Sequence, residues 1–113
     1  MEIIEKEVGD VVVLYFGGRL DASAANEADV KLNILMEKLP VRVVVNLDKL
    51  EYISSSGLRV LLASLKKAKK QQGDIKLTCL QPYVKEVFDI AGFLPLFQVF
   101  DKEENAINGF RQT

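Results

Sequence analysis

The sequence predicts an α/β fold in which a largely parallel sheet packs against helices and has an antiparallel strand at one edge. The first two β-rich runs are separated only by Gly9-Asp10, which suits a tight hairpin turn. Each later β-rich run follows a segment with apolar residues at helical spacing, and such units form parallel sheets with right-handed crossovers. The predicted order is ββαβαβαβα, and 113 residues suit one domain spanning 1–113.

The hairpin strands are predicted over residues 3–8 and 11–16, because both segments are rich in β-branched or aromatic residues. The pair Gly17-Gly18 is expected to end the second strand. The next run, 41–47, contains Val43-Val44-Val45, a segment typical of a strand covered on both faces. We therefore expect this strand at the centre of the sheet.

The last two strands are predicted over residues 75–79 and 96–100. In the first of them, Ile75, Leu77 and Cys79 alternate with polar residues, as in a strand. Cys79 is the single cysteine, so it cannot form an internal disulfide, and we expect it to be a small buried residue.

The first helix is predicted between the second and third strands. Asp21 or Ser23 can cap its N-terminus, and Pro40 stops it. Its apolar residues recur at spacings of three and four and therefore share one face: Ala25, Ala28, Leu32, Leu35 and Leu39.

The second helix is predicted after a serine-rich loop and ends near Gly73, which suits a left-handed C-cap. We interpret its lysines as a solvated face rather than a binding site. Its apolar side comprises Leu58, Leu61, Leu62, Leu65 and Ala68, and its other sides carry Arg59, Ser64, Lys66, Lys67, Lys69 and Lys70.

Two further helices are predicted in the last third of the chain. Pro82 suits the first turn of the third helix, and Gly92 ends it. Residues 101–104 resemble a capping box that introduces a short fourth helix. The apolar residues of the third helix are Val84, Val87, Phe88 and Ala91, and those of the fourth are Ala106, Ile107 and Phe110.

The composition argues against several classes of function. The 15 basic and 16 acidic residues produce no positive field for direct nucleic acid binding. The absence of histidine removes the usual general base and the commonest transition-metal ligand, so we expect no enzyme activity, no metal and no cofactor. No apolar run approaches the roughly 20 residues that cross a bilayer, and no secretion signal is evident, so we expect no membrane insertion and a cytoplasmic protein.

The most unusual segment is Ser54-Ser55-Ser56-Gly57, where the extension of a buried strand turns into a helix. The unpaired amides at a helix N-terminus stabilise an anion by about 0.3–1 kcal/mol when exposed and up to about 2 kcal/mol when partly buried. A phosphate on one of these serines would therefore meet hydrogen-bond donors. Plain helix capping is the alternative, and it explains one serine more readily than three.

Three segments together resemble the STAS domain of anti-sigma factor antagonists. They are ISSSGLRVLL (residues 53–62), Leu20-Asp21 after the Gly-Gly pair, and residues 84–93. The resemblance implies that Ser55 is phosphorylated by an anti-sigma factor that is also a serine kinase, and that a metal-dependent serine phosphatase removes the phosphate. It implies partner binding by the unphosphorylated form, which releases a sigma factor and regulates transcription.

The resemblance also indicates partner-binding residues around the serine: Asp21, Ser54, Ser56, Gly57 and Leu58. Asp21 can equally be a plain helix cap. We interpret Gly57 as the small residue that allows a tight loop and a close approach of the partner. Leu58 is interpreted as the first core residue of its helix.

Other interpretations of the domain remain open. Ser54 stands where many family members have aspartate, which favours a module that binds without phosphorylation, in a transporter or a signalling scaffold. A weak homodimer is also compatible with the sequence. A response-regulator fold would need an acidic pair after the first strand, and residues 15–18 contain none.

Overall fold

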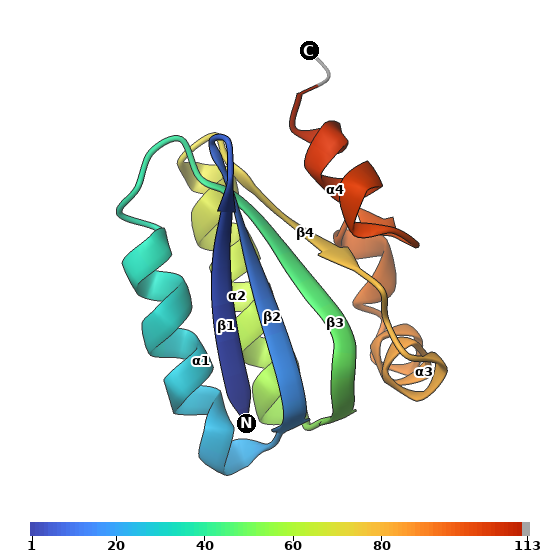
Figure 1. Ribbon diagram of the computed structural model, residues 1–113. Helices are drawn as coiled ribbons and strands as arrows, with labels where there is room; N and C mark the ends of the chain where they lie inside the picture. The colour runs from blue at the N-terminus through green and yellow to red at the C-terminus, as the bar shows by residue number, and fades with distance from the viewer. Residues whose placement is uncertain (112–113) are drawn as a thin grey trace.

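The computed structural model describes residues 1–111 and shows a five-stranded sheet in the order β1-β2-β3-β4-β5 (Figure 1). β1 is antiparallel to β2, and every other neighbouring pair is parallel, which confirms the predicted fold class and element order. The strands are β1 (Glu2–Val8), β2 (Val11–Leu20), β3 (Arg42–Ile53), β4 (Asp74–Thr78) and β5 (Val99–Phe100). The helices are α1 (Ala22–Leu35), α2 (Ser55–Lys70), α3 (Pro82–Ile90), the 3-10 helix η1 (Leu94–Leu96) and α4 (Glu103–Gly109).

Apolar side chains lie on both faces of the sheet because successive residues of a strand point to opposite sides. On one face, Leu14 and Val45 pack in a core with residues of α1, α2 and α3. On the other face, Val13 and Val44 pack beneath Ala106 of α4. β3 is the third of five strands, so its predicted central position is confirmed.

The strand β2 is longer than its sequence predicts. The expected end at Gly17-Gly18 is wrong, because β2 continues to Leu20 and stays paired with β3. Two register shifts in this pairing, and a φ of 87° at Gly18, allow the strand to continue. The extension brings the end of β2 level with the end of β3 at Ile53.

The C-terminal end of α1 differs from the prediction, whereas α2 ends at Lys70, directly before the segment 71–74 that was expected to end it, and only its left-handed residue differs. α1 ends at Leu35, and Leu39 is 68% exposed rather than on the buried face. After α2, the left-handed residue is Gln72, with a φ of 60°, and not Gly73. Gly73 serves close packing instead, because a Cβ there would lie 2.4 Å from the backbone oxygen of Val41.

Four further predictions are corrected. Ser64 is buried on α2 instead of exposed, and its Oγ has no hydrogen-bond partner within residues 1–111. Cys79 lies after β4, half-buried with a φ of 61°, so it ends the strand and is not a buried part of it. The last strand is only Val99–Phe100, because residues 94–96 form the 3-10 helix that contains Pro95. The capping box is wrong, since α4 is capped by Lys102 without a side-chain hydrogen bond.

Candidate functional site

The candidate site lies where β2 and β3 end side by side, at the bottom of Figure 1. Leu20 and Ile53 are the last paired residues of these strands, so the residues that follow them, Asp21 and Ser54, are neighbours across the sheet. Asp21 caps α1 and Ser54 caps α2. Two helices therefore begin next to each other, at the C-terminal ends of two neighbouring strands.

The hydroxyl of Ser54 is fully engaged in closing the loop. Its Oγ donates to the backbone oxygen of Leu20 at 3.2 Å and accepts from the amide of Gly57 at 3.1 Å. The amide of Ser54 also donates to the Leu20 oxygen, at 2.9 Å. Ser54 thus ties the start of α2 to the end of β2.

The next two serines are less constrained. Ser55 is the first residue of α2 and is exposed, and Ser56 follows it and is half-buried. Within residues 1–111, neither hydroxyl has a hydrogen-bond partner. Among the three serines, and within the described part of the chain, only Ser55 is exposed and has a hydroxyl without a hydrogen-bond partner.

Gly57 and Leu58 shape the site from beneath. A Cβ on Gly57 would lie 2.7 Å from Cγ of Leu20 and 2.9 Å from its backbone oxygen. Only glycine therefore lets the first turn of α2 approach the end of β2 so closely. Leu58 is 4% exposed and belongs to the core. Both residues position the serines, and a direct contact of either with a partner stays a prediction.

Asp21 uses its carboxylate for the neighbouring helix. Oδ1 accepts from the hydroxyl of Ser23 at 2.8 Å and from the amide of Ala24 at 3.0 Å. These hydrogen bonds, first that of Ser23 and then that of Ala24, lower the pKa of Asp21 below its ordinary value. The predicted capping role is confirmed, whereas a role in partner binding stays a prediction.

Cationic side chains lie near the loop in the sequence, and the first turn of α2 contains no acidic residue. Arg59 is exposed and lies four residues after Ser55, the spacing of side-chain neighbours on a helix. Arg19 stacks over the ring of Tyr52, with its Cζ 4.2 Å from the ring centroid. Sequence reasoning did not assign Arg19 or Tyr52 to the site, although both immediately precede the paired strand ends.

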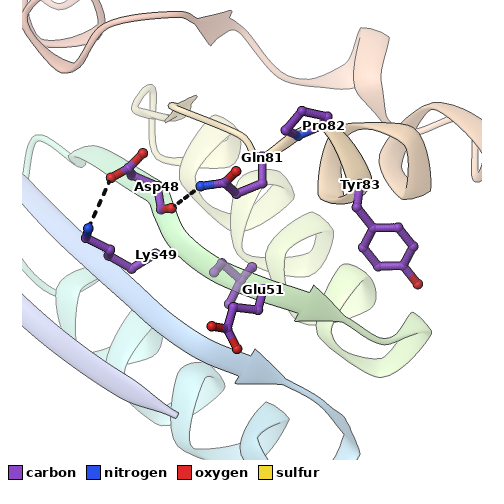
Figure 2. A pocket seen from close by; sticks show the side chains of 7 residues that line it. Asp48, Lys49, Glu51, Gln81, Pro82 and Tyr83 are labelled. Atoms are coloured by element: carbon purple, nitrogen blue, oxygen red, sulfur yellow. Dashed lines mark hydrogen bonds and ion pairs between the residues drawn. The ribbon is translucent and has the colours of Figure 1, made fainter.

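A groove between β3 and the start of α3 was also not foreseen (Figure 2). It encloses a volume of about 750 Å³ and is lined by Asp48, Lys49, Leu50 and Glu51 on one side and by residues 81–83 on the other. The side chain of Gln81 crosses it and donates to the backbone oxygen of Asp48 at 2.5 Å (Figure 2). The sequence contained no local signal for this groove, because its walls are at least 30 residues apart in the chain.

The described residues contain neither a candidate metal site nor a membrane-spanning helix. Among residues 1–111, no three His, Cys, Asp or Glu side chains are grouped so that they could hold a metal ion. In the same described part of the chain, no helix is both long and apolar enough to span a membrane.

Comparison with known proteins assigns the chain to one family. The STAS domain family matches residues 2–106, and the chain belongs to this family. BtrV of Bordetella bronchiseptica, which carries a provisional name as an anti-sigma factor antagonist, is 34% identical over 111 residues, covering 98% of this chain and 96% of that protein.

Solved structures share the fold. A provisionally named anti-sigma factor antagonist from Thermotoga maritima is 22% identical, has a TM-score of 0.91, and the match covers 97% of this chain and 95% of that one. Unphosphorylated SpoIIAA, an anti-sigma factor antagonist, is 22% identical with a TM-score of 0.76 and coverage of 99% and 100%. The phosphorylated form of SpoIIAA, from Bacillus, is 23% identical with a TM-score of 0.74 and coverage of 97% and 100%.

Proposed function

We propose that this chain is an anti-sigma factor antagonist whose binding is switched by phosphorylation of Ser55. The proposal rests on the difference between two serines of the loop. The Ser54 hydroxyl caps α2, whereas Ser55, the first residue of α2, is exposed and has no hydrogen-bond partner for its hydroxyl within residues 1–111. The similarity to BtrV over 98% of the chain supports the same function.

The unphosphorylated chain binds an anti-sigma factor through the loop and the start of α2, and so releases the sigma factor. Ser55 and Ser56 present neutral hydroxyls to the partner, and Asp21 and Ser54 contribute beside them. Gly57 and Leu58 act from below by holding the first turn of α2 against Leu20. The chain acts by binding alone, as one STAS domain over residues 1–113, and in the cytoplasm, where transcription takes place.

Phosphorylation is carried out by the bound anti-sigma factor, acting as a serine kinase. Oγ of Ser55 attacks the γ-phosphorus of ATP, ADP leaves, and the hydroxyl proton passes to a base of the kinase. The product carries about −1.5 to −2 charge in an interface built for a hydroxyl, and repulsion and desolvation weaken the complex. A metal-dependent phosphatase restores the hydroxyl by hydrolysis.

The fold accepts the phosphate without rearrangement. Ser55 is at the N-terminus of a 16-residue helix, where unpaired amides and the helix dipole favour an anion. Arg59 lies one turn further on the same side. The phosphorylated and unphosphorylated chains should therefore share one structure, and the switch acts on the partner's affinity.

A second candidate function is a STAS module that binds its partner without phosphorylation, in a transporter or a signalling assembly. Ser54 favours it, because the loop begins with a neutral cap at the position where many relatives recognised by kinases have aspartate. This candidate predicts that a negative charge at position 55 leaves partner binding unchanged.

The experiment that separates the two candidates is affinity capture from native cells on wild-type, Ser55→Ala and Ser55→Glu chains. We expect the wild-type and Ser55→Ala chains to retain a protein that, with ATP, phosphorylates the wild-type but not the Ser55→Ala chain. The Ser55→Glu chain should retain less of it, and Ser56→Ala, the matched control, should still be phosphorylated. A partner that lacks kinase activity and is retained equally by all three chains would establish the unphosphorylated module instead.

A further inference from the structure

A shallow apolar groove lies between the C-terminal half of α2 and the 3-10 helix η1. It encloses about 360 Å³, and its apolar lining comes from Leu62 and Leu65 of α2 and from Leu96 of η1. Leu96 is 51% exposed, and η1 contributes no buried residue to the core. Leu96 therefore forms a wall of this α2 groove, which presents apolar side chains to solvent.

The other residues that line the α2 groove are all lysines, Lys66, Lys69 and Lys70. Lys69 pairs with Asp74 at 3.2 Å, whereas Lys66 and Lys70 have no ion pair within residues 1–111. Lys66 and Lys70 are four residues apart on one helix, a spacing at which like charges repel each other. The dipole of α2 favours lysines in its last turn, but Lys66 precedes that turn. The groove therefore has two positive charges without a partner in the described chain.

A surface of the opposite charge, with an apolar residue in it, lies on α3. Ile90 is 79% exposed, the largest fraction among the large apolar side chains of the described residues. Glu86 lies one turn earlier on the same side of the helix, and Asp89 adjoins Ile90. Both acids are exposed, and neither forms an ion pair within the described part of the chain. We call Glu86, Asp89 and Ile90 the α3 patch.

The α2 groove and the α3 patch belong to neighbouring segments of the molecule. Leu96 follows Ile90 by six residues, and η1 is in contact with α3. A two-fold axis beside them can therefore bring the patch of each chain to the groove of the other, so that two equal contacts form at once. Each contact joins an apolar side chain to an apolar groove and acids to lysines.

We propose that the chain forms a symmetric dimer in which Ile90 of each copy enters the α2 groove of the other. The acids of the α3 patch then neutralise Lys66 and Lys70. The groove is small, so the dimer is weak and forms at high protein concentration. At about 1.5 Å per residue, Lys66 lies about 16 Å along α2 from Ser55. The dimer therefore leaves the switch loop exposed, and the proposal does not depend on the proposed function.

Sedimentation equilibrium of the full chain at low ionic strength tests the proposal. We expect a monomer–dimer equilibrium between about 10 μM and about 1 mM protein, the range of weak complexes. Added salt should shift it toward monomer, because exposed ion pairs are screened. Ile90→Ala should weaken the dimer about tenfold, because it removes an apolar contact from both halves of the interface. The same variant should keep the stability of the monomer, since Ile90 is 79% exposed.

Charge reversals make the test specific for these two surfaces. One variant carries Glu86→Lys and Asp89→Lys, and the other carries Lys66→Glu and Lys70→Glu. Each should be monomeric alone, because its patch and its groove then have the same charge. An equimolar mixture should form a heterodimer, because each patch then meets a groove of the opposite charge. Glu27→Lys, which reverses an exposed acid on α1, is the matched control and should dimerise like the wild type.

The outcomes decide the proposal. A wild-type chain that stays monomeric up to about 1 mM overturns it and leaves the α2 groove to a partner of another kind. A dimer that persists in both charge-reversed variants overturns it as well, because that dimer uses a different surface, and so does a mixture that stays monomeric. None of these measurements involves a kinase or a phosphate. Failure of the proposed switch would show instead in affinity capture on the Ser55 variants.

Discussion

The two helix N-termini that open side by side at the ends of β2 and β3 differ in one property, the charge of the cap. α1 is capped by the carboxylate of Asp21, which accepts from Ser23 and Ala24. α2 is capped by the neutral hydroxyl of Ser54, which accepts from Gly57. The backbone geometry is equivalent, since both caps follow strands that end at the same level.

This difference explains why one terminus suits a switch and the other does not. An anion already sits at the positive end of α1 and has a lowered pKa there. The first turn of α2 contains no acid, so its amides and dipole remain available to a phosphate on Ser55. The start of α1 thus has a permanent charge, whereas the proposed function gives the start of α2 a removable one.

The largest expected effect comes from the residue that brings α2 to this position. Gly57→Ala places a Cβ 2.7 Å from Cγ of Leu20, so the first turn of α2 must move. We expect the free energy of unfolding to fall by about 2–3 kcal/mol in urea denaturation, the cost of overpacking a tight contact. Gly17→Ala is the matched control, because its Cβ would meet Lys49 at an ordinary 3.5 Å. Equal stability losses in the two variants would contradict the close approach of α2.

Ser54→Ala removes the cap of α2 and leaves the loop backbone in place. We expect a loss of about 1 kcal/mol in the free energy of unfolding, the usual value for an N-cap. Ser55→Ala, one residue later, should cost much less because its hydroxyl has no partner in the described chain. A larger loss for Ser55→Ala than for Ser54→Ala would mean that Ser55 is the capping residue.

The contribution of the Asp21 cap to the stability of the fold should depend on pH. Because the pKa of Asp21 is lowered in the folded chain, the ionised carboxylate stabilises the fold at pH values above its ordinary pKa. This stabilisation is lost as the pH falls through the folded pKa. Thermal midpoints of wild-type and Asp21→Asn chains should therefore differ at neutral pH and converge in acid. A difference that stays constant with pH would show that the charge contributes nothing.

The smallest expected effect concerns Arg59 as a neighbour of the phosphate. In a chain that carries phosphoserine at position 55, Arg59→Gln should raise the second pKa of the phosphate by a few tenths of a unit. This is the value of one helical ion pair, about 0.3–0.5 kcal/mol. Phosphorus NMR across pH measures it, and Lys66→Gln on the same helix is the control. An unchanged pKa would place Arg59 away from the phosphate.

The fold was largely predictable because it follows from local patterns. The hairpin at Gly9-Asp10, the central Val43-Val44-Val45 strand and the helix after the serines each depend on residues close in sequence. The position of the candidate loop was predictable to the same extent, since a loop between a strand and a helix indicates a cap at the start of the helix.

The remaining features depend on contacts between distant segments. Which serine caps α2 is decided by the backbone oxygen of Leu20, 34 residues away from Ser54. Gly73 was misassigned because it allows the backbone of Val41 to pack closely against it, and does not adopt a left-handed conformation. β2 passes through Gly17-Gly18 because pairing with β3 outweighs the local preference of glycine for turns. The groove beside Asp48 exists only because β4 ends early.

The most direct test of the switch is phosphosite mapping by mass spectrometry on the chain purified from its native cells, in resting and in stressed or developmentally shifted cultures. The account predicts phosphate on Ser55, with an occupancy that changes between conditions, and none on Ser54, whose hydroxyl is engaged by Leu20 and Gly57. Phosphate confined to Ser54 or Ser56, or no phosphate on any of the three serines under any condition, would contradict it.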